Sequence, residues 1–156
     1  MKSTLLVVST AFLTALAISC ARSPSAPSES VSFAGNWNGT SMDSQGETIV
    51  AWTLSQARNS VSGTVTTQAP KPTDGSCNSC HRNKSGTVSG TISGPTLTLT
   101  MLFAAGVSGD PTPACTATVE GTVSHAGDDK LTGTYSGADS CEGLFMNGTL
   151  AMARRP

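Results

Sequence analysis

Apolar and polar residues alternate along most of the chain after residue 32, with Thr or Ser at many of the polar positions. Successive side chains of a β-strand point to opposite faces, so this alternation is typical of strands that bury one face. In residues 84–93, for example, Val88 and Ile92 share a face with two glycines, while Ser and Thr fill the other face. The pattern predicts eight strands, over residues 33–40, 48–56, 60–67, 84–93, 96–103, 114–124, 131–137 and 144–153.

Most segments between these strands are short and rich in turn-forming residues, such as 43–46 and 126–129. Consecutive strands are therefore expected to be antiparallel neighbours. No helical period of adequate length follows the first 18 residues, which argues against α/β folds. We predict an all-β fold, an eight-stranded antiparallel up-and-down β-barrel, because closure removes the exposed strand edges.

The alternation also predicts what faces the inside of the barrel. Gly-Thr occurs seven times, and each of these glycines falls on the inward face. Inward glycines either let a small barrel bend tightly, which we favour, or hollow out a ligand cavity. Glu120 is the one carboxylate in the middle of a strand, and its parity points outward. The apolar inward set is Trp37, Val50, Trp52, Leu54, Val65, Val88, Ile92, Leu99, Met101, Val119, Tyr135 and Met146.

The first 19 residues have the features of a cleaved signal peptide. Lys2 precedes an uncharged apolar run over residues 5–18, which is shorter than the roughly 20 residues that a spanning helix needs. Residues 17–20, Ala-Ile-Ser-Cys, resemble the bacterial lipobox, in which the Cys is lipid-modified and becomes the new N-terminus. This resemblance implies lipidation of Cys20, with ordinary cleavage and a free Cys20 as the alternative. The resemblance also implies a lipid-anchored protein of the bacterial cell envelope. Residue 21 is Ala and not the Asp that resembles an inner-membrane retention signal in some bacteria, so we expect the anchor in the outer membrane.

The expected organisation is a signal peptide over residues 1–19, a lipidated Cys with a Ser/Pro-rich tether over 20–32, and a β-barrel domain over 33–156. The 156 residues carry nine Lys and Arg against ten Asp and Glu, a formal charge of -1. Such a chain lacks the basic field that gathers nucleic acid, so nucleic-acid binding is not expected. The sequence makes no prediction about oligomeric state.

Gly35-Asn36-Trp37 lies in the first predicted strand, and Arg154 and Arg155 end the last one. A G-x-W motif at this place in an eight-stranded meander resembles the lipocalin and avidin-like proteins, the calycins. The resemblance covers residues 33–155, although the Thr-Asp-Tyr signature of many lipocalins is absent. It implies a lipocalin-like bacterial lipoprotein in which Arg154 packs over Trp37 and plugs one end of the barrel, as cation–π attraction allows.

The chain has five cysteines: Cys20, Cys77, Cys80, Cys115 and Cys141. With Cys20 lipidated, the other four form an even set in an oxidising compartment, where disulfides are expected. Four cysteines allow three pairings, and we favour Cys115 with Cys141 and Cys77 with Cys80.

Residues 77–81 match C-x-x-C-H, the pattern of covalent haem c attachment through Cys77, Cys80 and His81. The predicted setting, a loop between β-strands, favours a short disulfide instead. Zinc binding with His125 as a fourth ligand and dithiol redox chemistry are further alternatives, and both rank below haem.

No grouping of catalytic residues is visible, and the remaining carboxylates fall in or beside turns, so we predict no enzyme, no metal site and no required cofactor. The leading hypothesis is a non-enzymatic, membrane-anchored envelope lipoprotein that binds a small apolar ligand in the barrel or serves a structural role. The alternative is a redox or electron-transfer protein that uses the C-x-x-C-H motif.

Overall fold

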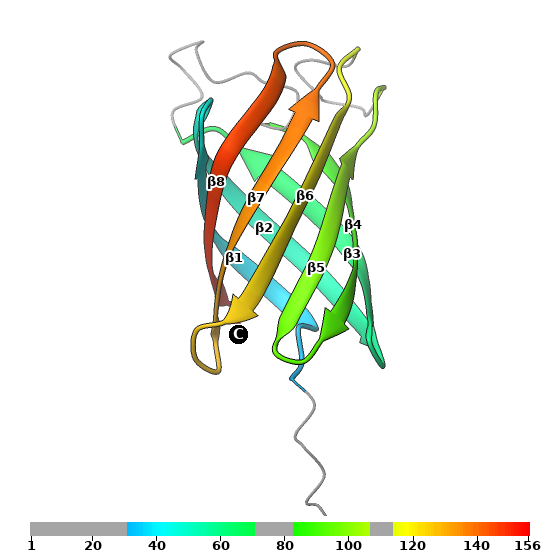
Figure 1. Cartoon of the computed structure of the whole chain (residues 1–156), viewed down its shortest axis with the longest axis vertical. Helices are drawn as coiled ribbons and strands as arrows, with labels where there is room; N and C mark the ends of the chain where they lie inside the picture. The colour runs from blue at the N-terminus through cyan, green and yellow to red at the C-terminus, as the bar shows by residue number, and fades with distance from the viewer. Residues whose placement is uncertain (1–30, 71–82, 107–113) are drawn as a thin grey trace, which may run out of the picture.

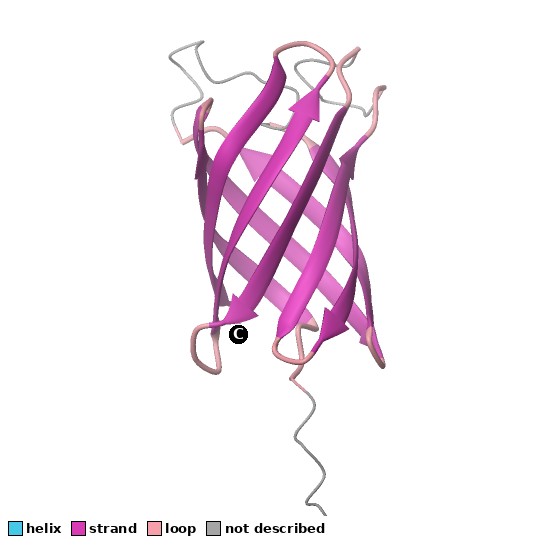
Figure 2. Ribbon diagram, viewed as in Figure 1, coloured by secondary structure: helices cyan, strands magenta, loops and turns pink. Residues whose placement is uncertain are grey.

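The computed structural model describes residues 31–70, 83–106 and 114–156, which form eight antiparallel strands in one closed barrel (Figure 1). Each strand pairs with its neighbours in sequence, and β8 pairs with β1 to close the barrel. Figure 2 shows strands joined by loops throughout the described part. The predicted all-β, eight-stranded antiparallel barrel is confirmed. The strands are β1 (Gly35–Asp43), β2 (Gly46–Ala57), β3 (Ser60–Gln68), β4 (Ser85–Ser93), β5 (Thr96–Phe103), β6 (Ala117–His125), β7 (Lys130–Asp139) and β8 (Gly143–Arg154).

The predicted signal peptide and the tether up to residue 30 lie outside the described residues. Within the described ranges, no helix has the length and apolar character that crossing a membrane requires.

The two ends of the barrel differ in what they carry. The chain enters β1 beside the C-terminus, at the lower end in Figure 1, which we call the Phe33 end. The β2–β3, β4–β5 and β6–β7 turns lie at this end because neighbouring strands are antiparallel. The opposite end, called the disulfide end, carries the β1–β2 and β7–β8 turns and the two longer connections, β3–β4 and β5–β6.

The seven inward glycines sit where neighbouring strands approach closely. A side chain on any of them would meet atoms of an adjacent strand at less than 3.0 Å. At Gly39 these atoms are the backbone of Ala151 and Met152 on β8. The glycines therefore permit tight bending of the barrel, as favoured from the sequence, and the space beside them is filled.

The predicted inward set is confirmed at nine of its twelve positions, whose side chains are at most 7 % exposed. Ile92 and Tyr135 are only partly buried and pack against this core. Glu120 is exposed, as its parity predicted. Inward and outward positions thus follow the alternation through most of the barrel.

The prediction that Met146 points inward is wrong, because β8 contains a β-bulge. Tyr135 of β7 pairs with Gly148, but Gly137 pairs with Phe145, so β8 has one extra residue in this interval. The extra residue reverses the alternation, which leaves Phe145 fully buried and Met146 56 % exposed. Asn147 takes up the bend with a left-handed backbone, φ 57°.

The close approach at Gly39 generates a stability prediction. Gly39→Ala places a methyl group against the backbone of β8, which cannot move like a side chain, so we expect a loss of about 2 kcal/mol or more in unfolding free energy. Thr40→Ala, at the adjacent exposed position, is the control and should change it by less than about 0.5 kcal/mol. Equal urea midpoints for the two variants would show that the strand approach is not tight.

Candidate functional site

The lumen of the barrel is filled by side chains. The hollow found inside has a volume of about 20 Å³, room for one water molecule, whereas pockets for small ligands measure roughly 300–1,000 Å³. It is lined by Ser41, Thr48, Val50, Thr67, Met101, Phe103, Val119, Tyr135 and Leu150. Within the part of the barrel that the described residues form, this hollow leaves no room for the small apolar ligand expected from the sequence.

The Phe33 end is closed by stacked rings and a guanidinium group. Phe33 and Trp37 are fully buried, and the Trp37 Nε1 donates a hydrogen bond to the Phe33 carbonyl over 2.8 Å. The Arg154 guanidinium lies over the Trp37 ring, 4.2 Å from its centroid. His125 contacts the Phe33 ring at 4.8 Å between centroids. These groups block the lumen at this end.

The residues just before β1 are held against the same end. Gln56 accepts a hydrogen bond from the Phe33 amide and donates one to the Val31 carbonyl. Arg154 donates to the carbonyls of Ser32 and Ala34, 3.3 and 2.6 Å away. Five hydrogen bonds, counting the one from Trp37, thus hold residues 31–34 to the barrel.

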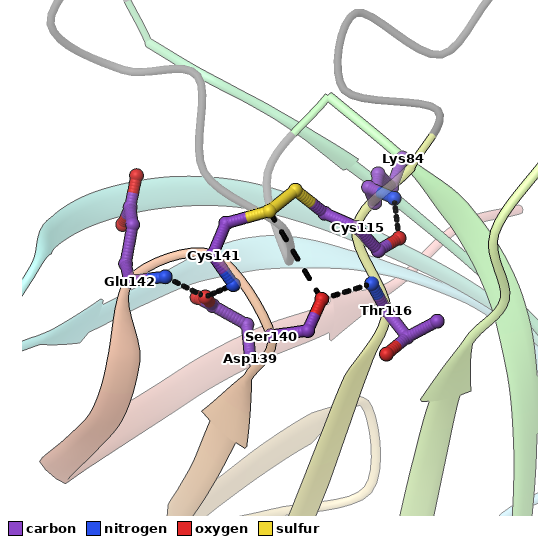
Figure 3. The surroundings of a disulfide bond; sticks show 7 residues. All are labelled: Lys84, Cys115, Thr116, Asp139, Ser140, Cys141 and Glu142. Carbon is purple, nitrogen blue, oxygen red and sulfur yellow. Dashed lines mark hydrogen bonds between the residues drawn. A yellow bond between two sulfur atoms is a disulfide. The ribbon is translucent and has the colours of Figure 1, made fainter.

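At the disulfide end, Cys115 and Cys141 are bonded, with their Cα atoms 5.8 Å apart (Figure 3). Asp139 Oδ1 accepts hydrogen bonds from the amides of Cys141 and Glu142, which fixes the β7–β8 turn. The buried Lys84 ammonium donates to the Cys115 carbonyl over 2.5 Å. The bond therefore joins the segment that precedes β6 to the β7–β8 turn within a network of hydrogen bonds.

A second polar contact lies inside the barrel near this end. The Tyr135 hydroxyl donates to Asp43 Oδ2 over 2.7 Å, and Asp43 Oδ1 accepts from the Gln45 amide. Thr67 exchanges hydrogen bonds with the backbone of Lys84. By contrast, the buried Thr48 hydroxyl, which also lines the hollow, has no hydrogen-bond partner among the described residues.

Two larger hollows, both widely open to solvent, lie on the outer wall of the barrel. One, about 660 Å³ and open to solvent, spans β5 to β8, and a second of about 390 Å³ lies next to it over β6 to β8. Glu120 and Ser136 line both hollows. This part of the wall is the candidate functional site.

Several predicted site residues lie outside the described residues: Cys20, Cys77, Cys80 and His81. Lipidation, haem attachment and redox chemistry therefore stay predictions. The β3–β4 connection, which contains residues 77–81, leaves and returns at the disulfide end, whereas His125 packs at the Phe33 end. His125 is thus poorly placed to complete a zinc site with that motif. The described ranges contain no group of three His, Cys, Asp or Glu side chains that could hold a metal ion.

Asp139 was expected in or beside a turn, and its hydrogen bonds place it at the β7–β8 turn. The structural roles of Lys84 and Gln56 were not found from the sequence. The side chains of Lys84 and Gln56 donate hydrogen bonds to carbonyl groups that lie 31 and 25 residues away in the sequence. No local pattern of residue types indicates such contacts.

Comparisons with known proteins agree on the fold alone. No protein-family model and no curated protein matches the chain. A redesigned β-barrel is similar, with a TM-score of 0.53, 15 % identity and coverage of 79 % of this chain and 91 % of its own. A fluorescence-activating β-barrel designed de novo gives a TM-score of 0.49 at 15 % identity, over 79 % of this chain and 94 % of its own.

The disulfide generates a stability prediction. It closes a loop with a sequence separation of 26, so its loss should reduce the unfolding free energy by roughly 3 kcal/mol in the chain-entropy model. Cys141→Ser should therefore lower the melting temperature markedly. The double variant Cys77→Ser, Cys80→Ser removes at most a very short loop and should lower it little. If the double variant is the less stable one, the C-x-x-C-H segment is part of the fold or holds a cofactor.

Arg154 should stabilise the fold more than its ion-pair partner Asp129 does. Arg154→Ala removes the contact with the Trp37 ring and two hydrogen bonds to carbonyls, and should cost about 2 kcal/mol of unfolding free energy. The Asp129 side chain is 74 % exposed, so Asp129→Asn should cost less than about 0.5 kcal/mol. Urea unfolding followed by Trp fluorescence measures both. A larger loss for Asp129→Asn would mean that the ion pair matters more than the ring contact.

Proposed function

We propose that this chain is a lipid-anchored protein of the bacterial cell envelope, a non-enzymatic module that works through the outer wall of its barrel and not through its lumen. The observation that supports a role of the outer wall instead of the lumen is the filled lumen, with its hollow of about 20 Å³. The lipocalin-like resemblance supports the architecture and the Trp37–Arg154 packing, while ligand binding inside the barrel finds no support in the geometry.

Lipid anchoring is supported by the lipobox-like residues 17–20 and by the polarity of the barrel. The chain that precedes residue 31 joins the Phe33 end. Among the described residues, this end carries four basic side chains, Arg58, Lys130, Arg154 and Arg155, against the acidic Asp128 and Asp129. Basic residues near an anionic membrane surface contribute about 1 kcal/mol each. A lipid on Cys20 would therefore place this end towards the headgroups.

Anchoring is tested by Cys20→Ser in a bacterial host. The substitution removes the acylation site, so the protein should move from the membrane fraction to the soluble fraction, and labelled palmitate should no longer be incorporated. Cys77→Ser is the matched control and should leave the protein in the membrane fraction. Unchanged fractionation of Cys20→Ser would contradict the anchoring.

The proposal that the lumen binds no ligand is tested on the purified protein. Titration with a fatty acid and with retinol, followed by quenching of the buried Trp37 and Trp52, should show no saturable binding, because the lumen has no room for either ligand. Stoichiometric quenching would overturn the proposal that the lumen is inactive, whatever the result for Cys20.

A further inference from the structure

The two hollows on the outer wall are adjacent and share two lining residues. Because Glu120 and Ser136 line both, the hollows meet at these two residues. We call the whole depression over β5 to β8 the wall groove. One part is lined largely by hydroxyl groups, including those of Thr122, Thr134 and Thr149, and the other by Ala138, Leu144 and Met146.

The bulge in β8 supplies part of this lining. It turns Met146 outward into the apolar part, while Asn147 lines the polar part with a left-handed backbone, φ 57°, which Asn tolerates better than most residues. Bulges re-aim side chains and are over-represented next to active sites. The bulge therefore makes the groove amphipathic instead of burying one more apolar side chain.

The exposed side chains of the groove combine one charge with apolar surface. Among the described residues, Glu120 is the only charged one that lines either hollow, and no ion pair joins it to another of them. Leu144 is 75 % and Met146 56 % exposed, the two highest values among the large apolar side chains described. Most of the remaining outward positions on these strands are Ser or Thr. A ligand that matches this surface has a positive charge close to aliphatic groups.

We propose that the wall groove binds an extended segment of a partner protein in which a Lys or Arg is flanked by aliphatic side chains. The cation pairs with Glu120, the aliphatic side chains cover Leu144 and Met146, and the hydroxyls with Asn147 bind polar groups of the segment. Met is flexible and polarizable, which suits contact with varied apolar partners. The proposal rests on the proposed function only in taking the outer wall as the working surface.

A basic segment fits better than a second copy of the barrel. Among the described residues, neither hollow is lined by a Lys or Arg, so the same surface of a second copy would bring no cation to Glu120. The closed barrel also has no free strand edge to which another strand could add. Recognition must therefore come from side chains of the wall.

The experiment uses the exported chain with Cys20→Ser, so its outcome does not depend on anchoring. A displayed library of random 12-residue peptides is selected on this protein and depleted on the same protein carrying Glu120→Gln. Enriched peptides should contain Lys or Arg next to Leu, Ile, Met or Val. Enrichment of acidic peptides, or no enrichment, would overturn the proposal.

Fluorescence polarisation with the most enriched peptide then locates the binding surface. Glu120→Gln should raise the Kd about tenfold and weaken its salt dependence, because a charge-assisted contact is lost. Met146→Ser should raise the Kd about fivefold through lost apolar contact.

The controls Glu47→Gln and Met42→Ser change an exposed carboxylate and an exposed Met outside the groove, and should leave the Kd unchanged. Equal effects in the groove and control variants would place binding elsewhere and refute the proposal. Melting temperatures within about 2 °C of the parent confirm that each variant is folded.

Discussion

The space inside a β-barrel is set by the number of its strands together with their tilt and stagger, and inward side chains must fill it or leave room for a ligand. This chain fills it with few large side chains. It has seven aromatic residues, and the six that are described, Phe33, Trp37, Trp52, Phe103, Tyr135 and Phe145, all contribute to the core. Glycines on the same inward faces let neighbouring strands approach closely, so the aromatic rings and small residues together leave a hollow of only about 20 Å³.

The alternation of apolar and polar residues predicted the strands, their antiparallel order and most of the inward positions, because a period of two is a local property of a strand. It failed in β8, where Leu144 and Met146 alternate as regularly as Leu150 and Met152 do. A bulge depends on how β7 and β8 pair, and local periodicity does not record pairing. The adjacent Asn147-Gly148 was the one available sign, since Asn tolerates a left-handed backbone better than most residues.

The candidate site was less accessible to sequence analysis than the fold. Glu120 was identified as the one mid-strand carboxylate with an outward parity, but its surroundings were not, because they come from three different strands. The Cys115–Cys141 pairing was predictable because the order of the strands brings both residues to the same end. By contrast, the contacts of Lys84 and Gln56 join side chains to distant carbonyls, which no pattern of residue types encodes.

A filled barrel changes where function is to be sought. A lumen that binds a ligand needs empty volume, and empty volume in a core costs stability. Here the lumen is packed, one end is closed by Trp37 and Arg154, and the other is braced by the disulfide and Lys84. Such a barrel holds its wall side chains in fixed positions, which lowers the entropic cost of binding through the wall.

The wall departs from a regular strand pattern at the β8 bulge, and that departure exposes Met146 beside Glu120 and the hydroxyl groups around it. Packing thus accounts for the rigid interior, and the bulge accounts for the mixed chemistry of the surface outside it.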